Sequence, residues 1–304
     1  MSISHYIKEI GRGKDGARAL TREKAADLFG QVLDGAVTDL EVGAFCLAMR
    51  IKGETPLEMA GFLDATAIRL ARVPTLGRTC VVLPSYNGAR KLPVLTPLLA
   101  LLLAREGLPV VVHGQATEAT RVSSQQVLQA LALPAQKIIE PIAAGSVQFI
   151  PTELLCPGLA RLLDVRRVVG LRNPAHSLVK LMNPCDSPAV VIGSYTHPEY
   201  AASMTATLHL VQATALLLRG TEGEPVADPR RTPAMDSFSN GESLRVQEQQ
   251  SGSLVSVPGL PAPDAASTAG WIQAVLDGQA PVPVSIAMQV AHIVQLSRQK
   301  MKAP

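Results

Sequence analysis

The residues best suited to chemistry form one stretch, residues 83–91, with the sequence LPSYNGARK. The apolar run before it predicts a buried strand, and the run after it predicts a helix. At such a junction, backbone N–H groups and the helix dipole can hold an anion, and Arg90 and Lys91 add two positive charges. The alternative is an ordinary turn, since Asn87 and Gly88 tolerate positive φ, followed by two solvated cations.

Two further sites follow apolar runs, at His113-Gly114 and at Glu222 with Glu224. The spacing pairs His113 with no Ser or Cys nucleophile that has an acid partner. We therefore expect a packed histidine rather than a catalytic base. Glu222 and Glu224 place two carboxylates in one loop, and hard cations such as Mg²⁺ bind such groups. Because no third ligand accompanies them, they are only weak metal candidates. We therefore expect no metal and no other cofactor.

Basic side chains are concentrated in one part of the chain. The densest group comprises Arg166, Arg167, Arg172, His176 and Lys180. Residues 73–180 carry 11 Lys and Arg against 5 Asp and Glu, whereas the whole chain has a net charge of only +3. This asymmetry predicts a basic face for an anionic partner, and we expect the group to face phosphates.

The elements that must position these residues follow two rhythms. Residues 1–72 are expected to be helical, with capping boxes at residues 38–41 and 55–58. From about residue 78, short apolar runs alternate with helical segments. The strands predicted from these runs are residues 79–83, 109–113, 147–150, 189–193 and 215–219. Between residues 223 and 270 only 244–248 looks like a strand, and two helices close the chain.

This pattern predicts an α/β fold in two domains. Residues 1–74 would form a small all-helical domain, and residues 75–304 a larger α/β domain with a mostly parallel central sheet. Ligands of such sheets bind at the carboxyl ends of the strands. The 83–91 stretch, His113 and Glu222 should therefore share one edge.

Composition limits the class of protein. A chain of 304 residues with 47% hydrophobic and 17% charged residues is expected to be globular. Its start has no apolar segment of the signal-peptide kind. The most apolar run, residues 92–104, is too short to cross a bilayer. The four cysteines are scattered, as is typical of reduced thiols. We expect a cytoplasmic protein with no membrane partner.

Several strings resemble a known family. They include LTRE at residues 20–23, AMRIKGETP at 48–56, VHG at 112–114, VSS at 122–124 and LMNP at 181–184. These strings are similar to the anthranilate phosphoribosyltransferases (glycosyl transferase family 3). The resemblance implies a nucleoside phosphorylase/phosphoribosyltransferase-like α/β domain and a homodimer formed through the helical domain.

The chain departs from this family at its substrate elements. The substrate-loop positions fall on Ser85, Asn87, Gly88, His113 and Gly114. The family's G-T-G-G-D loop, which wraps a pyrophosphate, is replaced from Pro84 onward. Pro84 donates no N–H, and Tyr86 is expected to crowd the pyrophosphate site. The family's paired magnesium carboxylates correspond to Glu222 and Glu224, with changed spacing. These departures imply that transferase activity is lost and that no catalytic residue remains.

A subgroup of this family, the YbiB-type proteins, is more similar still. The strings that carry this resemblance include IKEIGRGK at residues 7–14, PSYNGARK at 84–91, RNPAH at 172–176 and GTEGE at 220–224. The resemblance implies binding of DNA and RNA without sequence preference. The residues expected to hold phosphates are Arg90, Lys91, Arg121, Arg166, Arg167, Arg172 and Lys180. The alternative is an active transferase that uses phosphoribosyl pyrophosphate with another acceptor, with Glu222 and Glu224 on magnesium.

Overall fold

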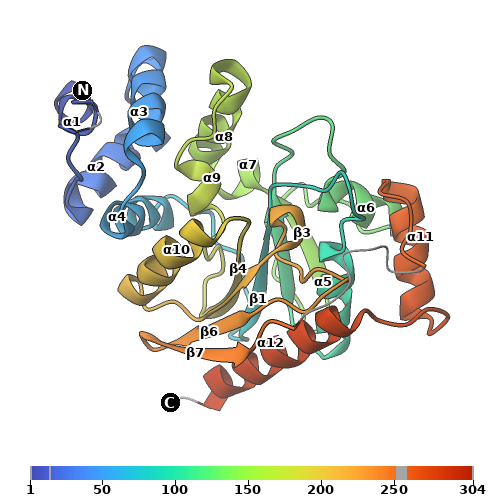
Figure 1. Cartoon of the computed structure of the whole chain (residues 1–304). Coiled ribbons are helices and arrows are strands. Elements are labelled where there is room, and N and C mark those ends of the chain that lie inside the picture. The colour runs from blue at the N-terminus through green and yellow to red at the C-terminus, as the bar shows by residue number, and fades with distance from the viewer. Residues whose placement is uncertain (1, 14, 251–258, 303–304) are drawn as a thin grey trace.

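The computed structural model describes residues 2–13, 15–250 and 259–302. The chain begins with a bundle of helices: α1 (Ser4–Ile10), α2 (Arg22–Leu33), α3 (Asp39–Lys52) and α4 (Pro56–Ala67). Both predicted capping boxes are present, at Thr38 with Glu41 and at Thr55 with Glu58. Pro56 starts α4, where its missing N–H costs nothing. The bundle lies at one side of the molecule (Figure 1).

A seven-stranded sheet forms the centre of the rest of the chain, in the order β3-β2-β1-β4-β5-β6-β7. Its strands are β1 (Cys80–Ser85), β2 (Val110–Gly114), β3 (Val147–Pro151), β4 (Ala189–Tyr195), β5 (Ala215–Arg219), β6 (Met235–Ser239) and β7 (Glu242–Gln247). Strands β1 to β5 are parallel, whereas β6 and β7 add an antiparallel edge. The predicted mostly parallel sheet is thus confirmed, and β6 is the strand that the sequence pattern missed.

Helices cover both faces of this sheet. They are α5 (Thr96–Arg105), α6 (Ser124–Ala130), α7 (Thr152–Leu155), α8 (Pro157–Val169), α9 (Ala175–Leu178), α10 (Pro198–Leu210), α11 (Ala265–Leu276) and α12 (Val284–Lys302), with a short 3₁₀ turn η1 (Thr221–Gly223). The long helix α12 runs along the sheet on the side away from the helical bundle (Figure 1). No helix within the described ranges is long and apolar enough to cross a membrane.

Alternating side chains of the strands feed two separate cores. In β1, Val82 packs with the helical bundle and with α8, α9 and α10, whereas Val81 and Leu83 pack with α5, α6, α11 and α12. This is the period of two expected for a strand that is covered on both faces. Because one core is continuous from α2 to the sheet, the helical bundle is held firmly against the α/β domain. All four cysteines are buried in these cores as free thiols.

Candidate functional site at the carboxyl edge of the sheet

The loop after β1 is wrapped around a carboxylate of the protein itself. Glu224, which is only 1% exposed, accepts the backbone N–H groups of Asn87 and Gly88, each at 2.8 Å. Its other oxygen accepts hydroxyl hydrogens from Ser85, Thr96 and Ser124. A hydrogen bond to a charged group contributes about 1.5–3 kcal/mol. Glu224 therefore accepts the first two amides of the loop that was predicted to hold an anion.

The segment after β5 brings Glu224 to this place. Strand β4 separates β1 from β5, so the segment must cross the carboxyl end of β4. Gly223 permits this, since its φ is +88° and a Cβ there would lie 1.9 Å from the Asn87 side-chain amide. Its carbonyl accepts hydrogen bonds from Ser194 on β4 and from Lys180. This segment, residues 220–224, thus closes the carboxyl edge of the sheet, and we name it the strap.

A second carboxylate occupies the outer half of the same loop. Glu222 accepts the backbone N–H groups of Arg90, Lys91 and Leu92 at 2.8–3.2 Å. It also pairs with the Arg121 guanidinium at 3.4 Å. Its side chain is 16% exposed, so this second position borders solvent.

The Tyr86 ring packs edge-on against His113 of β2. Its phenol is buried, and its oxygen contacts His113 Nδ1 at 2.7 Å and Thr152 at 3.0 Å. Burial lowers the pKa of His113 to about 3, so this histidine is neutral at physiological pH. His113 is therefore a packed residue, as expected. Its neighbour Gly114 must be glycine, because a Cβ would lie 2.0 Å from the Ser85 carbonyl oxygen.

Three predicted arginines converge on one carboxylate that the sequence analysis did not single out. Glu118, in the loop after β2, pairs with Arg166 at 2.7 Å, Arg121 at 3.1 Å and Arg172 at 3.5 Å. Burial would raise the pKa of Glu118, but Arg166 and Arg121 hold it below its usual range. Arg121 also reaches Glu222 and thereby joins this group to the Arg90 loop. Loops after β1, β2 and β5 and the end of α8 therefore meet at one place.

The remaining predicted cations differ in exposure. Arg90, Lys91 and Arg167 are exposed. Arg167 pairs with Asp164, one turn earlier on α8, at 3.0 Å. We name Arg90, Lys91, Arg121, Arg166, Arg167 and Arg172 the basic edge. Four of its six cations pair with the three carboxylates Glu118, Asp164 and Glu222, and the Arg90 and Lys91 side chains are exposed, so positive charge is in excess.

Lys180 lies behind the basic edge rather than on it. Only 9% of the residue is exposed, and its ammonium donates to the carbonyls of Ser194 and Gly223. Burial lowers the pKa of Lys180 to about 8. Together with Arg172 and His176, Lys180 lines a cleft of about 390 Å³ between the helical bundle and the α/β domain. Burial and the Arg172 charge lower the pKa of His176 to about 4.

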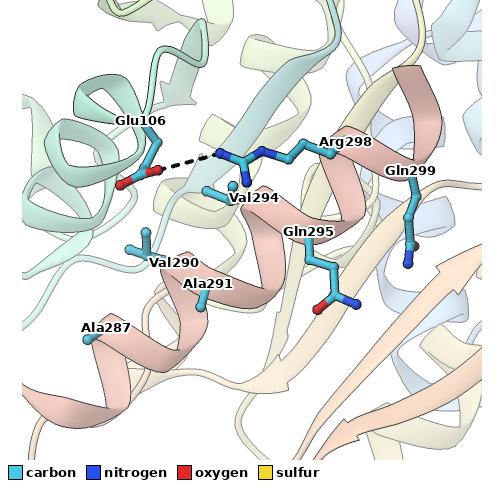
Figure 2. Close-up of a pocket in the computed structure, with 8 residues that line it drawn as sticks. All are labelled: Glu106, Ala287, Val290, Ala291, Val294, Gln295, Arg298 and Gln299. Atoms are coloured by element: carbon cyan, nitrogen blue, oxygen red, sulfur yellow. Dashed lines mark ion pairs between the residues drawn. The ribbon is translucent and has the colours of Figure 1, made fainter. Parts of the chain in front are cut away.

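A second hollow, of about 570 Å³, lies on the far face along α12 (Figure 2). Small apolar side chains and amides line it, and Arg298 crosses it to pair with Glu106 at 3.9 Å. None of the basic-edge residues is among its lining residues. This hollow is therefore separate from the candidate site.

The metal candidates already have donors on their carboxylates. The oxygens of Glu222 and Glu224 accept hydrogens from amides, hydroxyls and a guanidinium, which leaves few lone pairs for a cation. Among the described residues, no group of three His, Cys, Asp or Glu could hold a metal ion. The donor set therefore does not fit magnesium in the arrangement present here.

Comparison with known proteins defines the class of protein. A family model for the helical bundle domain of a glycosyl transferase family matches residues 4–67. Anthranilate phosphoribosyltransferase from Thermus thermophilus superposes with a TM-score of 0.74 at 20% identity, over 96% of this chain and 93% of that chain. The Saccharomyces cerevisiae enzyme in complex with PRPP and Mg gives a TM-score of 0.69 at 14% identity, over 98% of this chain and 89% of that chain. The chain thus has the anthranilate phosphoribosyltransferase fold.

Sequence relatives place the chain more narrowly. YbiB of Escherichia coli (strain K12) is 38% identical over 303 residues, which are 96% of this chain and 93% of that protein. The anthranilate phosphoribosyltransferase of Methanosarcina acetivorans is 29% identical over 264 residues, which are 83% of this chain but 65% of that enzyme. The chain belongs to the family of YbiB, within glycosyl transferase family 3.

Proposed function

We propose that this protein binds DNA and RNA through their phosphates, without sequence preference, and that it has no transferase activity. The observation that carries the proposal is the basic edge, where six cations come from three separate segments and only four of them pair with carboxylates. A row of cations at a sheet edge neutralises phosphates and releases their counterions. The arginines held by Glu118 are oriented in advance, which lowers the cost of ordering them on binding.

The composition favours contacts with the backbone of the nucleic acid. Phe, Trp and Tyr make up only 3% of the chain, so few rings are available to stack on bases. Phosphate contacts fix position on a nucleic acid without reading its sequence. We therefore expect affinity for duplexes and single strands of any sequence.

We propose further that two copies associate through the helical bundle. Leu40, Leu47 and Ile51 lie at positions seven and four apart on α3 and are 83%, 46% and 65% exposed. This spacing places all three side chains on one stripe of the helix. A two-fold dimer formed through this stripe would present two basic edges to one nucleic acid.

The basic edge can be tested by replacing Arg90 and Lys91 together by alanine. Both side chains are exposed, and only their backbone amides hold Glu222, so the fold is expected to survive. If each side chain contacts one phosphate, the slope of log affinity against log salt should flatten by up to about 1.8 on duplex DNA. Fluorescence anisotropy with two unrelated duplexes measures this slope, and both duplexes should respond alike.

A matched control lies at the amino ends of the strands, opposite the basic edge. Arg78 precedes β1 and Arg105 ends α5, before β2, and both are exposed. Their joint replacement by alanine removes the same charge and should leave the slope nearly unchanged. Equal losses in the two double variants would mean that net charge, and not the basic edge, governs binding.

A further inference from the structure

The outer half of the β1–α5 loop has the geometry of an anion site. Three successive backbone N–H groups, those of Arg90, Lys91 and Leu92, converge on the Glu222 carboxylate, and the Arg121 guanidinium faces the same group. Successive backbone amides that point at one place form a concavity that binds anions. We name these three amides and Arg121 the amide nest.

Glu222 resembles a phosphate in this nest. Its carboxylate shares one negative charge between two oxygens, as a phosphodiester does. One oxygen accepts all three amide hydrogens, and the other accepts the Arg90 amide and faces Arg121. Planar guanidinium groups pair well with either kind of anion.

The placement of Glu222 in the nest requires an unusual backbone conformation. Its φ is +50°, in the left-handed region that disfavours residues with a Cβ, and it lies within the 3₁₀ turn η1. Glu224, two residues later, is buried and anchored by its own donors, whereas the Glu222 side chain borders solvent. The outer carboxylate can therefore leave the nest while the inner one keeps the strap in place.

We propose that the amide nest is a phosphate site and that Glu222 is its built-in competitor. A group tethered by a short segment acts at an effective concentration in the millimolar range. For equal intrinsic affinities, free phosphate below that range leaves Glu222 in the nest. A nucleic acid already bound to the rest of the basic edge presents its next phosphate at a comparable effective concentration. The claim that the nest takes a phosphate of a bound nucleic acid rests on the proposed function. The claim that the nest binds an anion does not.

Inorganic phosphate is the direct probe of the nest. If Glu222 fills the nest for roughly 90–99% of the time, its removal should raise phosphate affinity by roughly 10- to 100-fold. The variant Glu222→Gly removes the carboxylate and suits the positive φ, and Glu222→Gln removes only the charge. Calorimetry at constant ionic strength should detect phosphate binding to Glu222→Gly and little or none to the wild type.

Two further variants make the result specific. Glu242→Gln removes one exposed carboxylate from β7 and should not increase phosphate binding. Adding Arg121→Met to Glu222→Gly should remove most of the gained affinity, because it deletes the cation of the nest. A folded Glu222→Gly variant that binds phosphate no better than the wild type, or a gain equalled by Glu242→Gln, would overturn the proposal.

A duplex titration with the same variants identifies the source of the phosphate. If Glu222→Gly binds duplex DNA more tightly, with a steeper salt dependence than Glu242→Gln, the nest serves nucleic-acid phosphates. If only inorganic phosphate binds more tightly, the nest serves a free phosphate, and the proposed function stands or fails on the basic edge alone.

Discussion

At the scale of single residues, two glutamates decide what the β1–α5 loop can do. The sequence placed Glu222 and Glu224 at a strand end and Asn87 and Gly88 in an anion-binding loop. It could not show that the two groups satisfy each other. The contact joins residues more than 130 positions apart and depends on how the strap crosses β4. The same limit applies to Glu118, whose three arginine partners come from its own loop and from the region around the end of α8.

The inner glutamate leads to a prediction about phosphoribosyl pyrophosphate. Because Glu224 already accepts the amides of Asn87 and Gly88, a diphosphate would have to displace a buried, fully hydrogen-bonded carboxylate. We expect calorimetry with this compound and magnesium to detect no saturable binding up to millimolar concentration. A saturable isotherm would restore the transferase hypothesis and would require the strap to open.

At the scale of elements, patterns of apolar residues predicted most of the sheet. The parallel strands β1 to β5 are mostly apolar, which is why each was predicted to within two residues at either end. Strand β6 (MDSFS) has no such run, because it lies near the antiparallel edge and has only two buried residues, Met235 and Phe238, among half-buried polar ones. The ends of helix α1 were not predicted, because it has only seven residues and no side-chain cap.

The exposed stripe of α3 leads to a prediction about assembly. Light scattering of the wild type should give twice the mass of one chain, which is 32.1 kDa. Replacing Leu47 and Ile51 by glutamate should give a monomer, since charges buried without partners in an interface are costly. The control is Leu244→Glu, a change of the same kind at a residue of β7 that is 67% exposed. A wild-type monomer at micromolar concentration, or a double variant that remains dimeric, would rule out this interface.

At the scale of the whole molecule, the proposed function depends on where the positive charge lies. The excess of cations in residues 73–180 was visible in the sequence. The structure places six of the predicted cations at one edge, and it places Lys180 behind that edge on two carbonyl groups. Sequence segments are not surfaces, so the charge count could suggest a basic face without assigning each side chain to it.

The salt dependence of nucleic-acid binding tests the central claim most directly. With roughly five phosphate contacts, log affinity for duplex DNA should fall with log salt with a slope of about −4.5. Raising salt from about 50 to about 200 mM should then weaken wild-type binding by about 500-fold, equally for unrelated sequences. A filter-binding titration at these two salt concentrations gives the answer. Binding that is absent at low salt, or that ignores salt, would contradict a function based on the basic edge.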